Sequence, residues 1–370
     1  MCSRVLPMFA PMKRIPTLDG WRALAIGGVL LHHATMGFYA TEASYYGVSN
    51  TLWGAFGVDI FFGLSGFLIT RLLVEEWDRR GAVDLRGFYL RRAFRILPPY
   101  AIFLLTVTAA GLWKSGWDLA GCLLFFRNYV PTRLGAPLTG HLWSLAIEEQ
   151  FYLLWPALML FAGRKKAVDV AAILALLVAT WRLIESQSDL SWFAQVPAHF
   201  RTDLRLDALL WGCVIAFLVS KEASRIRVAR QLRPAAWTVA AVLAILAVRY
   251  YSPASSVVLA VLIPGALVGT ALHPRWMISR VLESAPLRWM GRLSYSLYLW
   301  QQVFLRPGWE PRAHWWQHFP ANLAIAFAVA AASYYFLEKP MLHWGRHLAG
   351  RFAQDPAASA ARPRLLRHPL

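Results

Sequence analysis

The stretch LDGWRALAIGGVLLHHA, residues 18–34, places an arginine and two histidines in an apolar run that continues to about residue 40. A transmembrane helix needs about 20 mostly apolar residues. The basic residues Arg4, Lys13 and Arg14 precede this run, and no cleavage site of small residues follows it. The sequence therefore predicts an uncleaved membrane span over residues 20–40.

The composition extends this prediction to the whole chain. Of its 370 residues, 58% are hydrophobic and 16% are charged, whereas an ordinary soluble protein has about 25% charged residues. Mean hydropathy is +0.42, and the 18 tryptophans suit membrane–water interfaces. This composition excludes a soluble protein and indicates one polytopic membrane domain.

Further apolar runs predict an all-helical bundle of about ten transmembrane helices. The expected spans are residues 20–40, 53–74, 97–115, 141–162, 167–185, 203–220, 234–251, 255–273, 286–305 and 320–340. We expect the membrane domain to occupy residues 1–350. Residues 351–370 form a basic tail rich in Ala and Pro, which is expected to be disordered.

The basic residues predict the orientation of the bundle. If the N-terminus is cytoplasmic, 26 of the 38 Lys and Arg residues fall on the cytoplasmic side and nine on the outer side. The positive-inside rule then places both termini in the cytoplasm. It also explains the net charge of +18 without nucleic acid. Cys2, Cys122 and Cys213 are scattered, so neither a disulfide nor a metal site is expected.

Arg22 and His33 are the first candidates for a functional role, because ionisable groups inside a membrane are costly. Eleven residues at 100° each make about three turns plus 20°, so both side chains project from one helix face about 16 Å apart along the axis. Arg22 lies near the cytoplasmic end and His33 in the outer half, whereas His32 points about 100° away from His33. The alternative is a snorkelling arginine and a histidine bonded to a neighbouring helix.

Acidic residues on two other spans are expected at the depth of His33. Asp59 lies about six residues from the outer end of the second span, and Glu148 and Glu149 lie about seven residues into the fourth. A carboxylate beside an imidazole orients it and raises its basicity. These residues are candidates for catalysis with His33, and a structural ion-pair cluster is the alternative.

Arg92 and Arg95 form a candidate anion site in the cytoplasmic layer. They lie one helical turn apart at the predicted start of the third span and would make one patch of donors suited to phosphates. The alternative is ordinary positive-inside charge, which we accept for Arg79, Arg80 and Arg86.

Small and polar residues in other spans are harder to assign. Gly63, Ser65 and Gly66 permit close approach of a helix or a ligand, and helix packing is the favoured role. Asp203, Arg205 and Asp207 near the outer mouth could pair with one another or hold a polar acceptor. Aromatic residues of the stretch LSYSLYLWQQ, residues 293–302, are more often part of an interfacial belt than of a ligand site.

Several motifs in order resemble the membrane acyltransferase 3 family of bacterial O-acyltransferases. The resemblance covers residues 14–340 and is strongest in LDGWRALAIGGVLLHHA, FGVDIFFGLSGFLI, FYLRRAFRILPPY and HLWSLAIEEQFYLLWP. The stretches RTDLRLDALLWG and LSYSLYLWQQ fit the family's later, looser patterns. Where the family often has His after LYLW, this chain has Gln301, which cannot act as a base.

The resemblance implies transfer of an acyl group, often acetyl, from cytoplasmic acetyl-coenzyme A or another acyl-coenzyme A to a hydroxyl of a glycan at the inner membrane of a bacterium. It implies catalysis by His33 with Asp59, Glu148 and Glu149. Donor binding would fall to Arg22, Ser65, Arg92 and Arg95, and acceptor binding to Asp203, Arg205, Asp207, Tyr298 and Gln301. His33 could act as a general base or as an acyl carrier.

Two other classes compete with the enzyme. A transporter or flippase of a lipid-linked glycan would use the same intramembrane residue types, but it usually shows repeated halves, and none is evident here. A membrane scaffold would not need polar residues aligned at one depth.

Overall fold

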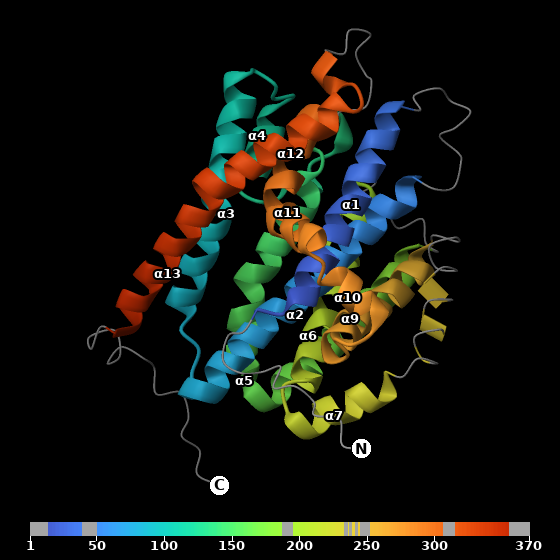
Figure 1. The fold of residues 1–370 in the computed structure, drawn as a ribbon, viewed down its shortest axis with the longest axis vertical. Coiled ribbons are helices and arrows are strands. Elements are labelled where there is room, and N and C mark those ends of the chain that lie inside the picture. The colour runs from blue at the N-terminus through green and yellow to red at the C-terminus, as the bar shows by residue number, and fades with distance from the viewer. Residues whose placement is uncertain are drawn as a thin grey trace.

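The chain folds as a bundle of helices (Figure 1). The computed structural model describes residues 14–38, 50–186, 195–232, 252–305 and 315–354, with a few further positions between 236 and 244. Every regular element in these ranges is helical, as predicted. The helices are α1 (Pro16–Phe38), α2 (Asn50–Arg80), α3 (Leu85–Ala109), α4 (Gly116–Leu123), α5 (Leu142–Glu185), α6 (Leu206–Leu218), α7 (Glu222–Gln231), α9 (Pro253–Leu272), α10 (Met277–Leu282), α11 (Ala285–Phe304), α12 (Ala321–Ser333) and α13 (Lys339–Gln354), with the π-helix Tyr334–Glu338 joining the last two.

Several of these helices can cross a membrane. Within the described ranges, four helical stretches are long and apolar enough: Gly54–Arg80, Leu142–Glu185, Pro253–Leu272 and Ala321–Arg351. Helix α6 is shorter but also apolar. The protein is therefore a multi-pass membrane protein. The total of ten spans stays a prediction, because residues 234–251 lie largely outside the described part of the chain, as does the tail after Gln354.

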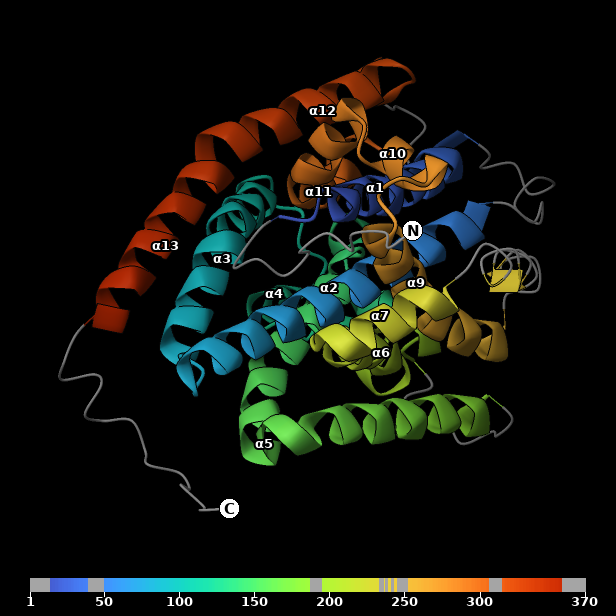
Figure 2. The same ribbon diagram turned by 60° about the horizontal axis from the view of Figure 1, so that its bottom comes forward.

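Helix α5 takes the place of the two predicted spans 141–162 and 167–185. It is one helix that changes direction at Gly163, where φ is 76° and ψ is 158° (Figure 2). Side chains with a Cβ are essentially excluded from this backbone conformation, so a glycine is required there. The predicted break is confirmed, but a bend at one residue replaces the expected loop.

Helix α3 begins well before the predicted start of the third span at residue 97. Its N-cap is Asp84, whose side chain accepts a hydrogen bond from the Gly87 amide at 3.1 Å. Such a cap satisfies a backbone donor that the first turn would otherwise leave without a partner. Arg92 and Arg95 are consequently well inside a helix rather than at its start.

Helix α2 packs against α1, α6 and α9 in the middle of the bundle (Figure 1). A Cβ on Gly66 would lie 1.8 Å from the carbonyl oxygen of Leu209, and a Cβ on Gly212 would lie 2.5 Å from that of Gly63. The backbones of α2 and α6 thus touch at glycines, as is typical of close helix pairs in membranes. The predicted packing role is confirmed for Gly66.

Helix α11 makes a similar close approach to α1. A Cβ on Gly291 would lie 1.8 Å from the carbonyl oxygen of Asp19. On another side of the bundle, α3 and α13 run side by side (Figures 1 and 2). These contacts place α1, α2, α3, α5 and α11 around the candidate site.

Candidate active site

A pocket of about 90 Å³ lies among α1, α2, α3, α5 and α11. Its volume exceeds that of a water site several-fold, so it can admit a phosphate group or the end of a flexible chain. Its charged lining residues are three arginines and one glutamate: Arg22, Arg92, Arg95 and Glu148. Arg22 of α1 and the arginine pair of α3 thus line the same pocket, which agrees with the common depth predicted for them.

Arg22 and Arg92 are held in different ways. Arg22 lies 3.6 Å from Asp19, which also binds Arg14 at 2.7 Å. The guanidinium of Arg92 lies 5.1 Å from the centre of the Tyr152 ring, a cation–π geometry. All three arginines are only partly buried. Three like charges around one pocket repel one another, so an anion with several negative charges would relieve that repulsion.

The basic residues that we assigned to topology lie elsewhere. Arg80 pairs with Glu76 at 3.2 Å, and Arg79 donates to the carbonyl oxygen of Glu75 at 3.1 Å. Arg91, next to Arg92 in sequence, also turns to Glu76, at 3.6 Å. The helical spacing of α3 therefore separates pocket arginines from surface arginines.

A chain of hydrogen bonds crosses the pocket beside the arginines. The hydroxyl of Tyr152 donates to Ser65 Oγ at 2.8 Å, and Ser65 donates to Glu148 Oε1 at 2.7 Å. Ser65 comes from α2, and Glu148 and Tyr152 lie one turn apart on α5. Glu148 therefore lies on the arginine side of the site, whereas the sequence placed it in a layer with His33.

Glu149 and Gln150 face other neighbours. Glu149 is half-buried, and its Oε1 atom is buried without a hydrogen-bond partner among the described residues. The Gln150 amide donates to the Phe125 carbonyl oxygen at 2.8 Å and to Asn128 at 3.0 Å. Gln150 thus connects α5 to the loop that precedes it, whereas Glu149 is not among the residues that line the pocket.

His33 is paired with the residue at which the sequence departs from the family pattern. Its Nδ1 atom lies 3.0 Å from Oε1 of Gln301 on α11. One turn earlier on α11, Tyr298 lines the pocket, and its hydroxyl contacts Ser144 at 2.7 Å and the carbonyl oxygen of His141. Helix α11 therefore connects the pocket wall with His33.

Asp59 does not contact His33 but forms a buried ion pair with Arg205. Asp207 forms a second buried ion pair, with Arg182 of α5. Arg205 and Asp59 are 4% and 2% exposed, so the pair is removed from water. The geometry of Asp59 thus agrees with the alternative interpretation, a structural ion pair. The two ion pairs form a cluster that connects α2 and α5 to α6.

Asp203 lies closer to the surface, with 37% of its side chain exposed. It pairs with Arg201 at 2.6 Å and accepts a hydrogen bond from Trp181 at 2.9 Å. Asp203, Arg205 and Asp207 therefore each pair with a residue outside their own group of three. Of the five predicted acceptor residues, only Tyr298 and Gln301 are shown by these contacts to adjoin the pocket or His33.

Three residues near the site were missed in the sequence. Asp19 precedes Arg22 by one turn, and Tyr152 follows Glu148 by one turn, so helical spacing could have indicated both. His141 is 4% exposed, and neither ring nitrogen has a hydrogen-bond partner among the described residues. His141 is the first residue of the HLWS segment and of a predicted span, and no helical spacing to another candidate residue singled it out.

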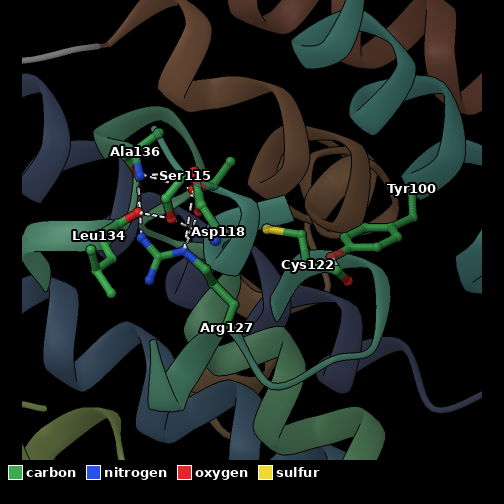
Figure 3. A network of polar contacts seen from close by, with 8 residues as sticks. Tyr100, Ser115, Asp118, Cys122, Arg127, Leu134 and Ala136 are labelled. Atoms are coloured by element: carbon green, nitrogen blue, oxygen red, sulfur yellow. Dashed lines mark hydrogen bonds and ion pairs between the residues drawn. The ribbon is translucent and has the colours of Figure 1, made fainter. Parts of the chain in front are cut away.

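A buried polar network holds the loop between α4 and α5 (Figure 3). The Asp118 carboxylate pairs with Arg127 at 2.9 Å and accepts hydrogen bonds from Thr139 at 2.7 Å and from the Ala136 amide at 2.9 Å. Ser115 caps α4 and also binds the Leu134 carbonyl oxygen at 2.7 Å. This network fixes the segment that leads into His141 and Ser144.

The fold and pocket define a multi-pass helical membrane protein with a cavity between its helices that three arginines line. A family profile described as an acyltransferase domain matches residues 15–338. The chain therefore belongs to the acyltransferase 3 family, a family of acyltransferases, as the sequence motifs indicated.

Proteins similar to this chain include O-acetyltransferases and provisionally named O-acetyltransferases from Listeria monocytogenes and Bacillus subtilis. The chain is 28% identical to the peptidoglycan O-acetyltransferase OatA of Listeria monocytogenes, over 89% of this chain and 56% of OatA. It is 29% identical to YrhL of Bacillus subtilis, provisionally named a peptidoglycan O-acetyltransferase, over 89% and 55% of the two chains. The chain spans about half the length of these curated relatives. No solved structure matches it.

Proposed function

We propose that this protein is a membrane O-acyltransferase that moves an acetyl group from cytoplasmic acetyl-coenzyme A to a hydroxyl of a cell-surface glycan. The observation that carries the proposal is the pocket in which Arg22, Arg92 and Arg95 from two helices converge. Coenzyme A is an anion with several phosphates, and arginine is the side chain best suited to bind phosphate in a bidentate way.

The arginines form the donor end of the proposed site. Arg92 and Arg95 hold the phosphates from the cytoplasmic side, and Asp19 holds Arg22 toward the same pocket. Ser65 and Tyr152 supply hydroxyl groups along the wall. The Glu148 carboxylate accepts a hydrogen bond from the Ser65 hydroxyl and keeps that hydroxyl oriented.

His33 forms the transfer end. As a general base, it takes the proton of the acceptor hydroxyl while the oxygen attacks the thioester carbonyl carbon. The carbon–sulfur bond then breaks, and the thiolate takes the proton back from the imidazolium. As an acyl carrier, His33 would instead attack the thioester itself and pass the acyl group to the acceptor. Both routes produce one ester and one thiol.

The acceptor is proposed from the relatives, two of which are named for peptidoglycan. A peptidoglycan-type glycan would approach from the outer side of the cytoplasmic membrane. Tyr298 and Gln301 lie near the transfer end, and Asp203 offers an exposed carboxylate. The buried ion pairs of Arg205 and Asp207 suit a structural role better.

The test is turnover of acetyl-coenzyme A by the purified full-length protein in detergent or nanodiscs. His33→Ala should lower turnover about 10²- to 10⁴-fold, the contribution of a general base, while the protein still inserts. His32→Ala is the matched control, because it removes the neighbouring imidazole, whose ring centre lies 5.1 Å from that of His33, and leaves His33 in place. Mass spectrometry of surface glycans from a deletion strain would identify the acceptor. Wild-type protein that neither binds nor turns over acetyl-coenzyme A would refute the proposal and favour glycan transport.

A further inference from the structure

Gln301 and His33 form a polar contact between α11 and α1. The distance from Gln301 Oε1 to His33 Nδ1 is 3.0 Å. Gln301 is fully buried, and its amide nitrogen has no hydrogen-bond partner among the described residues. Among the described residues, His33 is therefore the hydrogen-bond partner of the Gln301 side chain.

This contact selects one tautomer of His33. An amide oxygen can only accept a hydrogen bond, and a neutral imidazole carries its proton on one of its two nitrogens. The atom beside Gln301 Oε1 is Nδ1, so a hydrogen bond forms there only in the tautomer that carries the proton on Nδ1. Nε2 is then left with its lone pair, and that is the atom able to accept a proton or to attack a carbonyl carbon.

We propose that Gln301 is a positioning residue that holds His33 in the Nδ1–H tautomer, so that Nε2 is the reactive nitrogen. This inference rests on the proposed acyltransferase function. It applies to either route, because a general base and an acyl carrier both need an unprotonated ring nitrogen. The inference also gives a role to Gln301, which stands where the family often has histidine. An amide oxygen still accepts a hydrogen bond, but the glutamine side chain cannot gain or lose a charge.

The position of Gln301 suits this role for a packing reason as well. Helices α1 and α11 touch at the Gly291–Asp19 contact, where no Cβ would fit. Helix α11 also carries Tyr298, whose hydroxyl binds the carbonyl oxygen of His141 at the start of α5. Gln301 therefore projects from a helix that is fixed at two levels, and it can hold the ring of His33 in one orientation.

The direct test is nitrogen-15 NMR of the histidine side chains in the full-length protein in nanodiscs, with His33→Ala used to assign the His33 signals. We expect the neutral His33 ring to show Nδ1–H and a free Nε2. The isosteric Gln301→Glu variant should keep that tautomer, and Gln301→Leu should lose it. A wild-type ring protonated on Nε2, or a tautomer unchanged in Gln301→Leu, would overturn the inference. This result does not depend on whether acetyl transfer is observed.

Kinetics provide a second test. Gln301→Leu should lower kcat at least about tenfold, as expected when the wrong tautomer is populated, with little change in KM for acetyl-coenzyme A. Gln302→Leu is the matched control, because Gln302 is also buried on α11 but is not the hydrogen-bond partner of His33. Equal losses in the two variants would show a packing effect and overturn the positioning role.

The pH profile separates positioning from a purely structural role. In Gln301→Glu the new carboxylate stabilises the protonated imidazole, so the acidic limb of the profile should move up by about one to three pH units. Activity should recover above that limb, because the carboxylate still accepts from Nδ1–H. An unchanged acidic limb in Gln301→Glu would refute the contact between this side chain and the reacting histidine.

Discussion

Asp59→Asn is the change that most sharply tests the buried ion pair of Asp59 and Arg205. The two side chains are 2% and 4% exposed, so the substitution leaves a guanidinium charge in a buried site without its carboxylate. Breaking a buried pair from one side typically costs about 3–5 kcal/mol. A second ion pair, Asp207 with Arg182, belongs to the same cluster on α6. We therefore expect a loss near the lower limit, about 3 kcal/mol.

The assay is reversible unfolding of the purified protein in mixed micelles, followed by circular dichroism. The double variant Asp59→Asn with Arg205→Gln should recover most of the lost stability, because both charges are removed together. Asp169→Asn is the control, since Asp169 is an exposed carboxylate on α5. If Asp59→Asn kept wild-type stability but lost acetyl transfer, the ion-pair reasoning would be refuted and a catalytic role for Asp59 would be supported.

Three other substitutions test the pocket and the packing. Arg92→Lys keeps a charge but loses the planar fork, so affinity for acetyl-coenzyme A measured by calorimetry should fall about tenfold. Arg79→Lys is the control and should leave that affinity unchanged. Equal affinities in the wild type and both variants would place the donor site elsewhere. Glu148→Gln removes the negative charge from the pocket, so donor affinity should rise about three- to tenfold while turnover falls. A fall in donor affinity would contradict this electrostatic account. Gly66→Ala puts a Cβ 1.8 Å from the Leu209 carbonyl oxygen, so the melting temperature should drop, and an unchanged value would show that α2 and α6 can separate at no cost.

Much of the helical architecture could be predicted because lipid imposes a simple rule of length and apolarity. The break near Gly163 was visible as a glycine followed by Arg164, Lys165 and Lys166. The early start of α3 could also have been predicted, because Asp84 is a standard N-cap residue. Apolar runs alone do not reveal this start, because the first turns of α3 are strongly basic.

The site was only partly predictable, because sequence gives depth in the membrane but not position around the bundle. Arg22, Arg92 and Arg95 were assigned to one depth and do line one pocket. Asp59 was assigned to the depth of His33, but it faces Arg205. That choice of partner depends on the close packing of α2 on α6 through Gly66, which one sequence does not reveal.

The single-residue bend in α5 has a consequence for how this membrane domain carries its site. Helix α5 brings Ser144, Glu148 and Tyr152 to the pocket before Gly163, and Arg182 to the ion pair with Asp207 after it. The two arms are joined directly at Gly163, with no loop between them. A shift of α6 against the second arm must therefore be transmitted to the wall of the pocket, or be absorbed by the dihedral angles of one glycine.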